Sequence, residues 1–526
     1  MATVSNNPPA NIGSPTAKPA AEKLPVLQGG GLVAAGLLLA VANFIVVLDT
    51  TIANVSVPHI AGGLAVSSNE GTYVITSYAV AEAITVPLTG WLANRFGTVR
   101  VFTTSMLLFG IFSLLCGMAG SLGFLVMARV FQGLSGGPLI PLSQTLLMRV
   151  FPKDKQTAAL GLWSMTTLIA PILGPIVGGY ICDNWSWPVI FYINLPIAAL
   201  CSFLAYNMLV PFETRKRSVP IDFVGLTLLI VWVSAMQIML DEGKNYDWFS
   251  SSFIITLAIV AVVGFISFVI WELTDKQPVV DLRVFRHRGY TASVITISLA
   301  FGAFFSSVVL MPLWLQGYMG YTATWSGYVS AATGVLAVII APFAAKLSAK
   351  VDARILVFFG VMWMGFWTME RAFNTTDMSY AQIAFPLLMQ GIGLPFFFIP
   401  LTGLSLSSVN PEETAGAAGL MSFLRTVSGA FATSIVTTSW DNEASHFKND
   451  LVGIIASPQQ LASTLSAGGG DPQKALGLMD QLVQNQSIML STNAIFFTAS
   501  LAFSLAACAI WLAPKPTRKA DTSAAH

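Results

Sequence analysis

Ionisable side chains are scarce in this 526-residue chain. Asp, Glu, Lys and Arg make up 10% of it, against about a quarter of an average soluble domain, whereas 55% of its residues are hydrophobic. The net charge of +1 gives no electrostatic reason to expect a nucleic-acid partner. These proportions exclude a soluble globular domain and predict an all-α integral membrane protein embedded in a lipid bilayer.

Residue types that usually carry catalysis or bind metals are also few. Four cysteines occur without any Cys-x-x-Cys pair or metal-ligand spacing. The four histidines are scattered and fall outside the predicted membrane spans, at His59, His287, His446 and His526. The chain has no G-x-x-x-x-G-K-[ST] loop that would cradle ATP phosphates. We therefore expect a protein that is not an enzyme and that uses neither a cofactor nor a metal.

Apolar runs, in contrast, fill most of the chain. Fourteen of them are long enough to cross a bilayer, which takes about 20 residues. They are 33–57, 72–93, 101–120, 124–148, 157–182, 188–210, 221–241, 252–273, 290–317, 324–349, 353–371, 380–404, 414–438 and 488–513. Placing both termini in the cytoplasm leaves only Lys244, Arg371, Lys448 and Lys474 as external basic residues. That asymmetry is the one expected of cytoplasmic loops.

The spans fall into a six, two, six arrangement. We expect a cytoplasmic tail at 1–30 whose composition is too polar to order, a six-helix half at 31–210, two central helices at 211–275, a second half at 276–513 and a tail at 514–526. The second half contains a long external loop at 439–487. In that loop Asp471 and Pro472 are typical of a helix start, and predict a short amphipathic helix that could dock a partner or lie on the protein's own surface.

The two halves echo each other in sequence. Gln132-Gly133 recurs as Gln390-Gly391, and Gly161-Leu162 recurs as Gly419-Leu420, both 258 positions further on. A weak internal repeat is the expected signature of a transporter whose site lies between two related halves.

Four of the charged residues inside spans are candidate functional groups, because charge in a membrane span is expensive and usually functional. Asp49 lies past the middle of the first span, and Glu82 lies near the centre of the second. Removal from water favours the protonated form of a carboxylate, so either acid is a candidate for proton coupling. The alternative is a structural carboxylate bonded to neighbouring helices. Arg129 needs an acceptor and could pair with Asp49 or Glu82, either as a displaceable partner or as a static clamp; Arg425 is a similar case.

Glycines mark two further segments. Residues 90–97 join the second and third spans through Gly90, Arg95 and Gly97, and indicate a gate hinge on the cytoplasmic side. In the fifth span, Gly174 and Gly178 share one face and allow close helix approach, with Pro175 and Gly179 beside them.

These segments resemble the major facilitator superfamily. Residues 90–97 look like its cytoplasmic loop motif, 129–133 like its fourth-helix motif, and 170–179 like the antiporter motif that marks exporters. Across the membrane region the chain is similar to the fourteen-helix drug:proton antiporters, and among them to the EmrB-type exporters of Gram-negative inner membranes. One departure is Asn94, where the loop motif usually has an acid, so that Arg95 is its remaining charged contact.

The resemblance implies the major facilitator fold and proton-driven multidrug efflux from the inner membrane, a basis of antibiotic resistance. It further implies a tripartite pump with an EmrA-type periplasmic adaptor and a TolC-like outer-membrane channel. For a substrate wall, an apolar cavity with few polar groups is expected. The candidates are Gln132, Phe304, Phe305, Trp314, Gln316, Phe397 and Arg425. A dedicated exporter of one metabolite, such as a fatty acid or siderophore, is the alternative.

Overall fold

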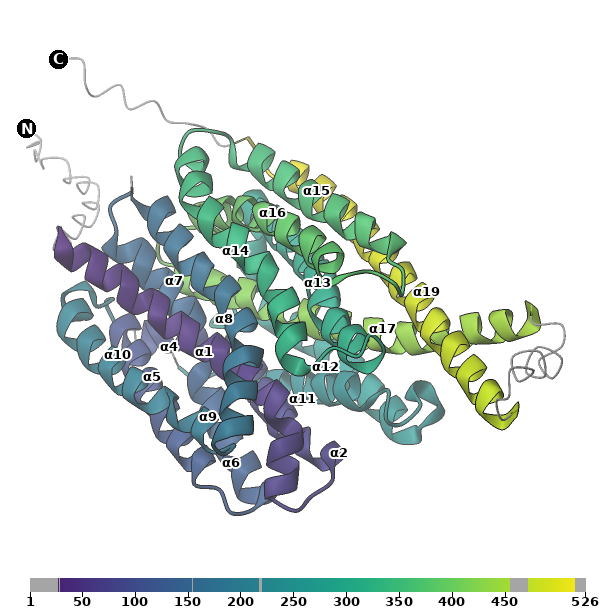
Figure 1. Ribbon diagram of the computed structural model, residues 1–526. Helices are drawn as coiled ribbons and strands as arrows, with labels where there is room; N and C mark the ends of the chain where they lie inside the picture. The colour runs from purple at the N-terminus through teal and green to yellow at the C-terminus, as the bar shows by residue number, and fades with distance from the viewer. Residues whose placement is uncertain (1–26, 28, 154, 217–219, 455–471, 516–526) are drawn as a thin grey trace, which may run out of the picture.

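The computed structural model describes residues 27, 29–153, 155–216, 220–454 and 472–515, and every regular element in these residues is helical. Figure 1 shows a bundle of long helices whose described chain begins and ends at the same end of the molecule. The N-terminal helices are α1 (Gly30–Gly63), α2 (Ser68–Gly71), α3 (Tyr73–Thr85), α4 (Thr89–Phe96), α5 (Thr98–Gly117), α6 (Leu122–Gly136), α7 (Leu139–Val150), α8 (Gln156–Asn184), α9 (Val189–Tyr192) and α10 (Asn194–Leu209).

Two central helices and six C-terminal helices follow. The central pair is α11 (Phe223–Glu242) and α12 (Ser252–Thr274). The C-terminal helices are α13 (Arg288–Gly317), α14 (Ala323–Ser348), α15 (Ala353–Glu370), α16 (Tyr380–Ser407), α17 (Thr414–Ile454) and α19 (Pro472–Ala509). Short 3-10 turns follow α10, α15 and α19, at Val210–Phe212, Arg371–Phe373 and Ile510–Leu512, and precede α12 and α13, at Trp248–Ser250 and Leu282–Arg286.

Buried apolar side chains form separate clusters along the chain. One cluster runs from Leu32 to Phe212 and another from Val284 to Ile510, so the N-terminal and C-terminal helices each have a core. Helix α8 packs against α1 on one side and α14 on the other, and thereby joins the two sets of helices. Large apolar side chains also cover the outside, which is expected of a surface that meets lipid rather than water.

The predicted count of fourteen spans is only partly matched. Among the described residues, eleven helices are long and apolar enough to cross a membrane, or twelve if α8, bent by 42° between Ala158–Pro171 and Leu173–Cys182, is one span. The predicted span 72–93 is broken into α3 and α4, each too short alone, and 353–371 is α15, whose ends carry Arg354 and Glu370.

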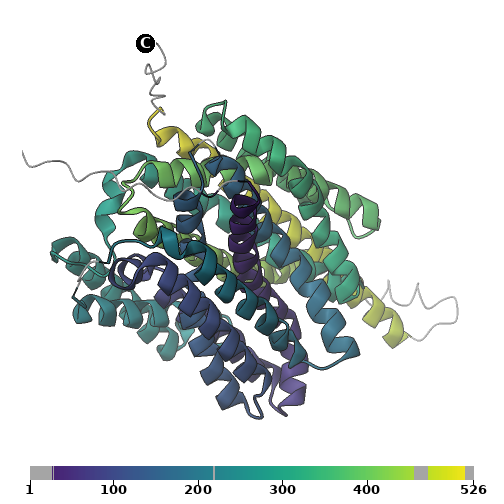
Figure 2. The same ribbon diagram turned by 90° about the vertical axis from the view of Figure 1, so that its left-hand side faces the viewer.

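The segment predicted as a loop at 439–487 differs from the structure. Helix α17 continues to Ile454 and α19 begins at Pro472, so most of the predicted loop is helical. Hydropathy falls where a helix leaves the bilayer, but the backbone hydrogen bonds continue into water. The two helical extensions project from the bundle as arms (Figures 1 and 2) and are joined by an ion pair of 2.9 Å between Lys448 and Asp480. The predicted N-cap Asp471 lies outside the described residues.

The central helices pack beside the contact between α3 and α17. Their cluster combines residues such as Leu229 and Trp232 of α11 with Ala83 of α3 and Phe423 of α17. Ser434 donates to the Leu240 carbonyl at 2.9 Å, which fixes α11 on α17. The central pair is therefore held by helices from both sides of the molecule.

A tight turn at Gly97 connects α4 to α5. Its φ of +98° lies in a region that side chains with a Cβ rarely adopt, and an added Cβ would lie 2.6 Å from the Glu213 carboxyl carbon. Glu213 in turn accepts hydrogen bonds of 3.0 Å from the backbone amides of Val99 and Arg100, which are free at the start of α5. The turn thus brings a carboxylate from the end of α10 onto the first turn of α5.

Gly97→Ala is expected to destabilise the protein by about 1–3 kcal/mol, because it combines backbone strain with displacement of Glu213. The measurement is unfolding in mixed micelles by titration with SDS. Gly179→Ala is the control, since an added Cβ at Gly179 meets nothing within 4 Å. Equal stability of the two variants would show that the turn tolerates a side chain.

Candidate functional site

A buried ion pair joins α1 to α6. The Arg129 guanidinium donates to Asp49 Oδ2 at 2.6 Å, and each side chain is 1% exposed. Asp49 Oδ1 accepts two more hydrogen bonds, from Gln132 Nε2 at 3.1 Å and from Asn194 Nδ2 at 2.6 Å. Three helices therefore converge on one carboxylate, and its charge is matched by a guanidinium and two amide dipoles.

The residues around this pair are fixed by further contacts with neighbouring helices. Asn194 also donates to Ser113 Oγ at 3.0 Å, which ties α5 into the cluster. Arg129 donates through Nε to the Val74 carbonyl at 3.1 Å and lies over the Tyr78 ring at 4.2 Å, which ties in α3. In this conformation Asp49 is saturated and has no room for substrate.

Small residues allow the helices to approach this closely. An added Cβ at Gly133 of α6 would lie 2.5 Å from the Tyr78 carbonyl oxygen. On α8, a Cβ at Gly174 would lie 2.2 Å from Thr51 Oγ1, and one at Gly178 would lie 3.3 Å from Ile52, so both glycines face α1. Pro175 is half-buried between them. Gly179, with open space around it, faces away from this contact.

Glu82 is in a different situation from Asp49. It lies half-buried on α3, and its carboxylate forms neither a hydrogen bond nor an ion pair with other described residues. Arg425 of α17 is the cation with the largest electrostatic effect on it, ahead of Arg129. Arg425 is 5% exposed, its Nε is unpaired within the described part of the chain, and its guanidinium lies 5.4 Å from the centre of the Phe301 ring. An unpaired acid and an unpaired base thus influence each other between the N-terminal and C-terminal helices.

The loop motif lies where the N-terminal helices meet α17. An added Cβ at Gly90 would lie 2.6 Å from the Gly416 Cα, so the two backbones touch. Arg95 lies over the rings of Trp91 and Phe96, at 5.6 and 5.8 Å from their centres. This contact between α4 and α17 closes the two sets of helices against each other at one end.

The residues predicted to form a substrate wall come together only in part, around Phe301. Gln132 belongs to the Asp49 cluster, Trp314 and Phe397 are fully buried in packed apolar clusters, and Gln316 is exposed. Phe304 and Phe305 are half-buried on α13, beside the Phe301 ring that covers Arg425. Aromatic content alone does not separate a cavity wall from ordinary packing.

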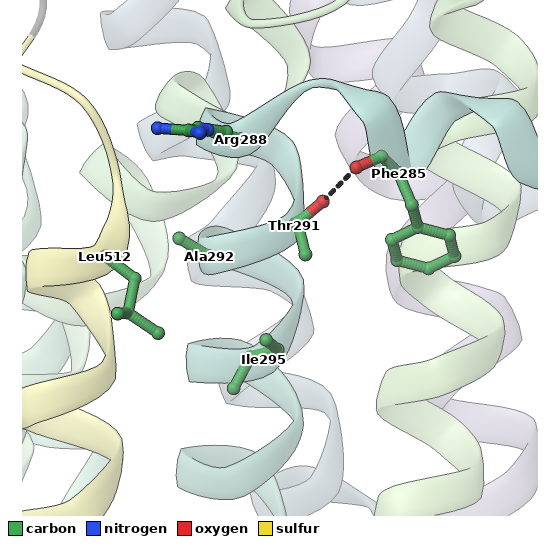
Figure 3. Close-up of a pocket in the computed structure, with 6 residues that line it drawn as sticks. All are labelled: Phe285, Arg288, Thr291, Ala292, Ile295 and Leu512. Carbon is green, nitrogen blue, oxygen red and sulfur yellow. Dashed lines mark hydrogen bonds between the residues drawn. The ribbon is translucent and has the colours of Figure 1, made fainter.

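Two cavities are described. The larger, about 560 Å³, lies between α8 and α14 and is lined by small apolar residues with Lys346 and Lys350 among them. The smaller, about 190 Å³, lies at the start of α13, where Arg288 and Leu512 flank it and Thr291 donates to the Phe285 carbonyl at 2.6 Å (Figure 3). Only the larger cavity lies between N-terminal and C-terminal helices.

Sequence reasoning missed three polar residues that the structure places at buried sites. Asn194 and Ser113 carry no charge, so hydropathy does not distinguish them from packing residues. The contact of Asn194 with Asp49, and that of Ser113 with Asn194, depend on the fold. Arg371 was assigned to the external end of a predicted span, and its burial, at 1% exposed, was not predicted. Its position 258 residues after Ser113 is the signal that could have placed it.

Comparisons with known proteins identify relatives over most of the chain. Residues 39–433 match the family model described as Major Facilitator Superfamily. The chain is 43% identical to the multidrug export protein EmrB of Escherichia coli K12, over 93% of this chain and 97% of that protein. It is 42% identical to the fatty acid resistance protein FarB of Neisseria gonorrhoeae, over 94% and 98%. The solved proton:xylose symporter XylE shares the fold, with a TM-score of 0.57 at 14% identity, over 92% of this chain and 96% of that one.

Removing one partner of the Asp49–Arg129 pair should be more damaging than removing both. Asp49→Asn or Arg129→Gln alone is expected to lower the free energy of unfolding by about 3–5 kcal/mol, because each leaves a buried charge unpaired. The double variant should lose clearly less than the sum of the two. SDS titration of all four proteins measures this coupling.

Arg425→Gln is the control for that cycle, since it removes a buried guanidinium that forms no hydrogen bond with the described residues. It should cost little stability or raise it. Additive losses for Asp49 and Arg129 would contradict the assignment of a tightly coupled pair.

Proposed function

Because the chain belongs to the major facilitator superfamily, we propose that this multi-pass membrane protein exports hydrophobic drugs and other amphipathic toxic compounds in exchange for protons. The observation that carries the proposal is the contrast between two membrane acids. Asp49 is saturated by three donors, whereas Glu82 has no partner among the described residues and lies within electrostatic range of Arg425.

Glu82 is suited to carry the proton. A carboxylate that leaves water without a partner binds a proton readily, and it releases that proton when a cation approaches. Glu82 lies on α3 and Arg425 on α17, so their separation changes whenever the N-terminal and C-terminal helices rock against each other. In the outward-facing state Glu82 takes up a proton; in the inward-facing state Arg425 approaches and the proton leaves to the cytoplasm.

Asp49 and Arg129 have a different role in the proposed transport cycle, which is to hold neighbouring helices together. Their cluster joins α1, α3, α5, α6 and α10, so these helices move as one body. Protonation of Asp49 would weaken the charge-assisted bond to Arg129 and loosen that body. We therefore assign Asp49 and Arg129 a supporting part in proton coupling, and Glu82 the leading part.

Export rather than import is supported by the α1–α8 contact and by the relatives. Gly174 and Gly178 pack α8 closely on α1, beside the bend of α8, and belong to the segment that resembles the antiporter motif. The relative EmrB is named a multidrug export protein. We further propose fourteen membrane crossings: the eleven long apolar helices, α3 and α4 together as one, α8 and α15. In this proposal both termini lie in the cytoplasm and the membrane is a bacterial inner membrane.

The helical arms of α17 and α19 support a tripartite assembly. They extend away from the bundle, on the side opposite the described chain ends, which is the periplasmic side in this orientation (Figure 1). The α19 arm exposes Leu478 and Leu482, one turn apart and 59% and 62% exposed. An apolar stripe on a projecting helix suits a helical partner, and we assign it to an EmrA-type adaptor that leads to a TolC-like outer-membrane channel.

A dedicated exporter of amphipathic acids is the second candidate. The cavity between α8 and α14 is apolar and includes two lysines, which would pair with a carboxylate while an alkyl chain fills the apolar part. The relative FarB is named a fatty acid resistance protein.

Glu82→Gln should abolish substrate-driven proton release, because the amide cannot exchange a proton at any physiological pH. The assay uses proteoliposomes with an imposed pH gradient and a panel of cationic, neutral and carboxylate-bearing hydrophobic compounds. Glu70→Gln, on the exposed helix α2, is the matched control and should couple normally. Full coupling in Glu82→Gln would remove this residue from the mechanism, and transport confined to the carboxylates would favour the second candidate.

Leu478→Glu combined with Leu482→Glu should abolish drug resistance in cells that contain the adaptor, since two charges on the apolar stripe oppose docking. Transport by the purified variant in proteoliposomes should be unchanged, because both side chains are exposed. Loss of transport in proteoliposomes would instead assign the arm to the transporter itself.

A further inference from the structure

The C-terminal helices contain a second buried polar cluster, centred on Arg371 at the end of α15. Its Nη2 donates at 3.1 Å to Ser307 Oγ of α13, to Thr368 Oγ1 of α15 and to Gln390 Oε1 of α16. Its guanidinium also lies 4.7 Å from the centre of the Phe496 ring of α19. All of these partners are neutral, so none of them balances the positive charge.

This cluster is the repeat-related copy of the Asp49 cluster. The offset of 258 residues that relates Gln132 to Gln390 also relates Asp49 to Ser307 and Ser113 to Arg371. Both sets of residues are brought together in their own half of the molecule. The copies differ in charge, because the N-terminal cluster has an acid and a base whereas the C-terminal cluster has a base alone.

Because the C-terminal cluster has no acid, two of its buried N–H donor groups have no acceptor in the described structure. Arg371 is 1% exposed, and its Nη1 is buried and has no hydrogen-bond partner in the described structure. Three residues further on, Asn374 is 2% exposed, and its Nδ2 is likewise buried and unpaired there. The neighbouring Glu370 is exposed and forms no ion pair with Arg371 within the described ranges. An unbalanced guanidinium at such depth is unfavourable unless an anion accompanies it.

We propose that Arg371 holds a monatomic anion, with chloride as the physiological ion, at the place where the N-terminal cluster has the carboxylate of Asp49. The size of the ligand follows from the packing. Arg371 is enclosed by α13, α15, α16 and α19, and it lines neither of the two cavities described above. An amphipathic carboxylate would need space for its chain, whereas a single ion needs little more than a water molecule occupies.

The anion completes the C-terminal cluster as Asp49 completes the N-terminal one. It supplies the acceptor that Nη1 lacks and the negative charge that balances the guanidinium, which then holds α13, α15 and α16 together. Chloride should therefore stabilise the folded protein, since a ligand that binds only the native state raises its stability.

The test compares thermal unfolding of the purified full-length protein in chloride and in gluconate at equal ionic strength, followed by tryptophan fluorescence. Wild-type protein should unfold at a Tm roughly 2 °C or more higher in chloride. Ser307→Asp provides a fixed carboxylate at the position equivalent to Asp49. It should match wild type in chloride and lose most of the chloride effect.

Ser306→Asp is the matched control, because Ser306 donates to the Gly302 carbonyl and does not contact Arg371. It should keep the chloride effect. Anomalous diffraction from crystals grown in bromide gives an independent readout, with a peak next to Arg371 in wild type that is absent in Ser307→Asp.

Equal Tm values in chloride and gluconate, together with no bromide peak at Arg371, would overturn the proposal. A chloride effect of the same size in Ser307→Asp as in wild type would also overturn the proposal, because the anion would then bind elsewhere. Stabilisation by laurate but not by chloride, lost in Arg371→Gln, would overturn it in favour of a substrate carboxylate. None of these outcomes depends on Glu82 or on transport.

Discussion

The cost of charge in a medium without water is the constraint on which this structure depends. An ionised side chain inside a bilayer must be balanced by an opposite charge and by hydrogen bonds, or it destabilises the fold. Asp49 and Arg129 satisfy that constraint completely, with donors from α6 and α10 on one carboxylate. Close packing through Gly133 and Gly174 brings the helices near enough for those bonds to form.

Three buried charged sites differ in how fully their charges and hydrogen-bonding groups are paired. The Asp49 cluster is neutral overall and fixed. Arg371 is surrounded by neutral acceptors and lacks an anion among the described residues. Glu82 and Arg425 influence each other without bonding in the described conformation. In the transport cycle that we propose, the fixed pair holds one group of helices together, and the unpaired acid and base respond when the two groups of helices rock against each other.

The sequence alone was sufficient for the membrane class, the family resemblance and the membrane acids, because charge in an apolar run is conspicuous. It left two partners open for Arg129, and the fold selects Asp49. The contact with Asn194 could not be predicted, since the amide lies 145 residues away and looks like any polar residue. The ends of the helices were the least accurate part of the prediction from sequence. Hydropathy stops at the membrane surface, so it gave a loop where α17 and α19 continue, and it gave no sign that Arg371 is buried.

The position of α11 and α12 makes the molecule asymmetric in the plane of the bilayer. Helix α11 packs on α3 and α17, and α12 packs on α11, away from α8 and α14. The outer face of α12 exposes apolar residues such as Ile259 and Val262. One flank of the molecule is thereby covered by a hairpin of two helices, and the cavity between α8 and α14 lies away from that hairpin. In the export that we propose, a hydrophobic compound would reach this cavity from the flank that the hairpin leaves uncovered.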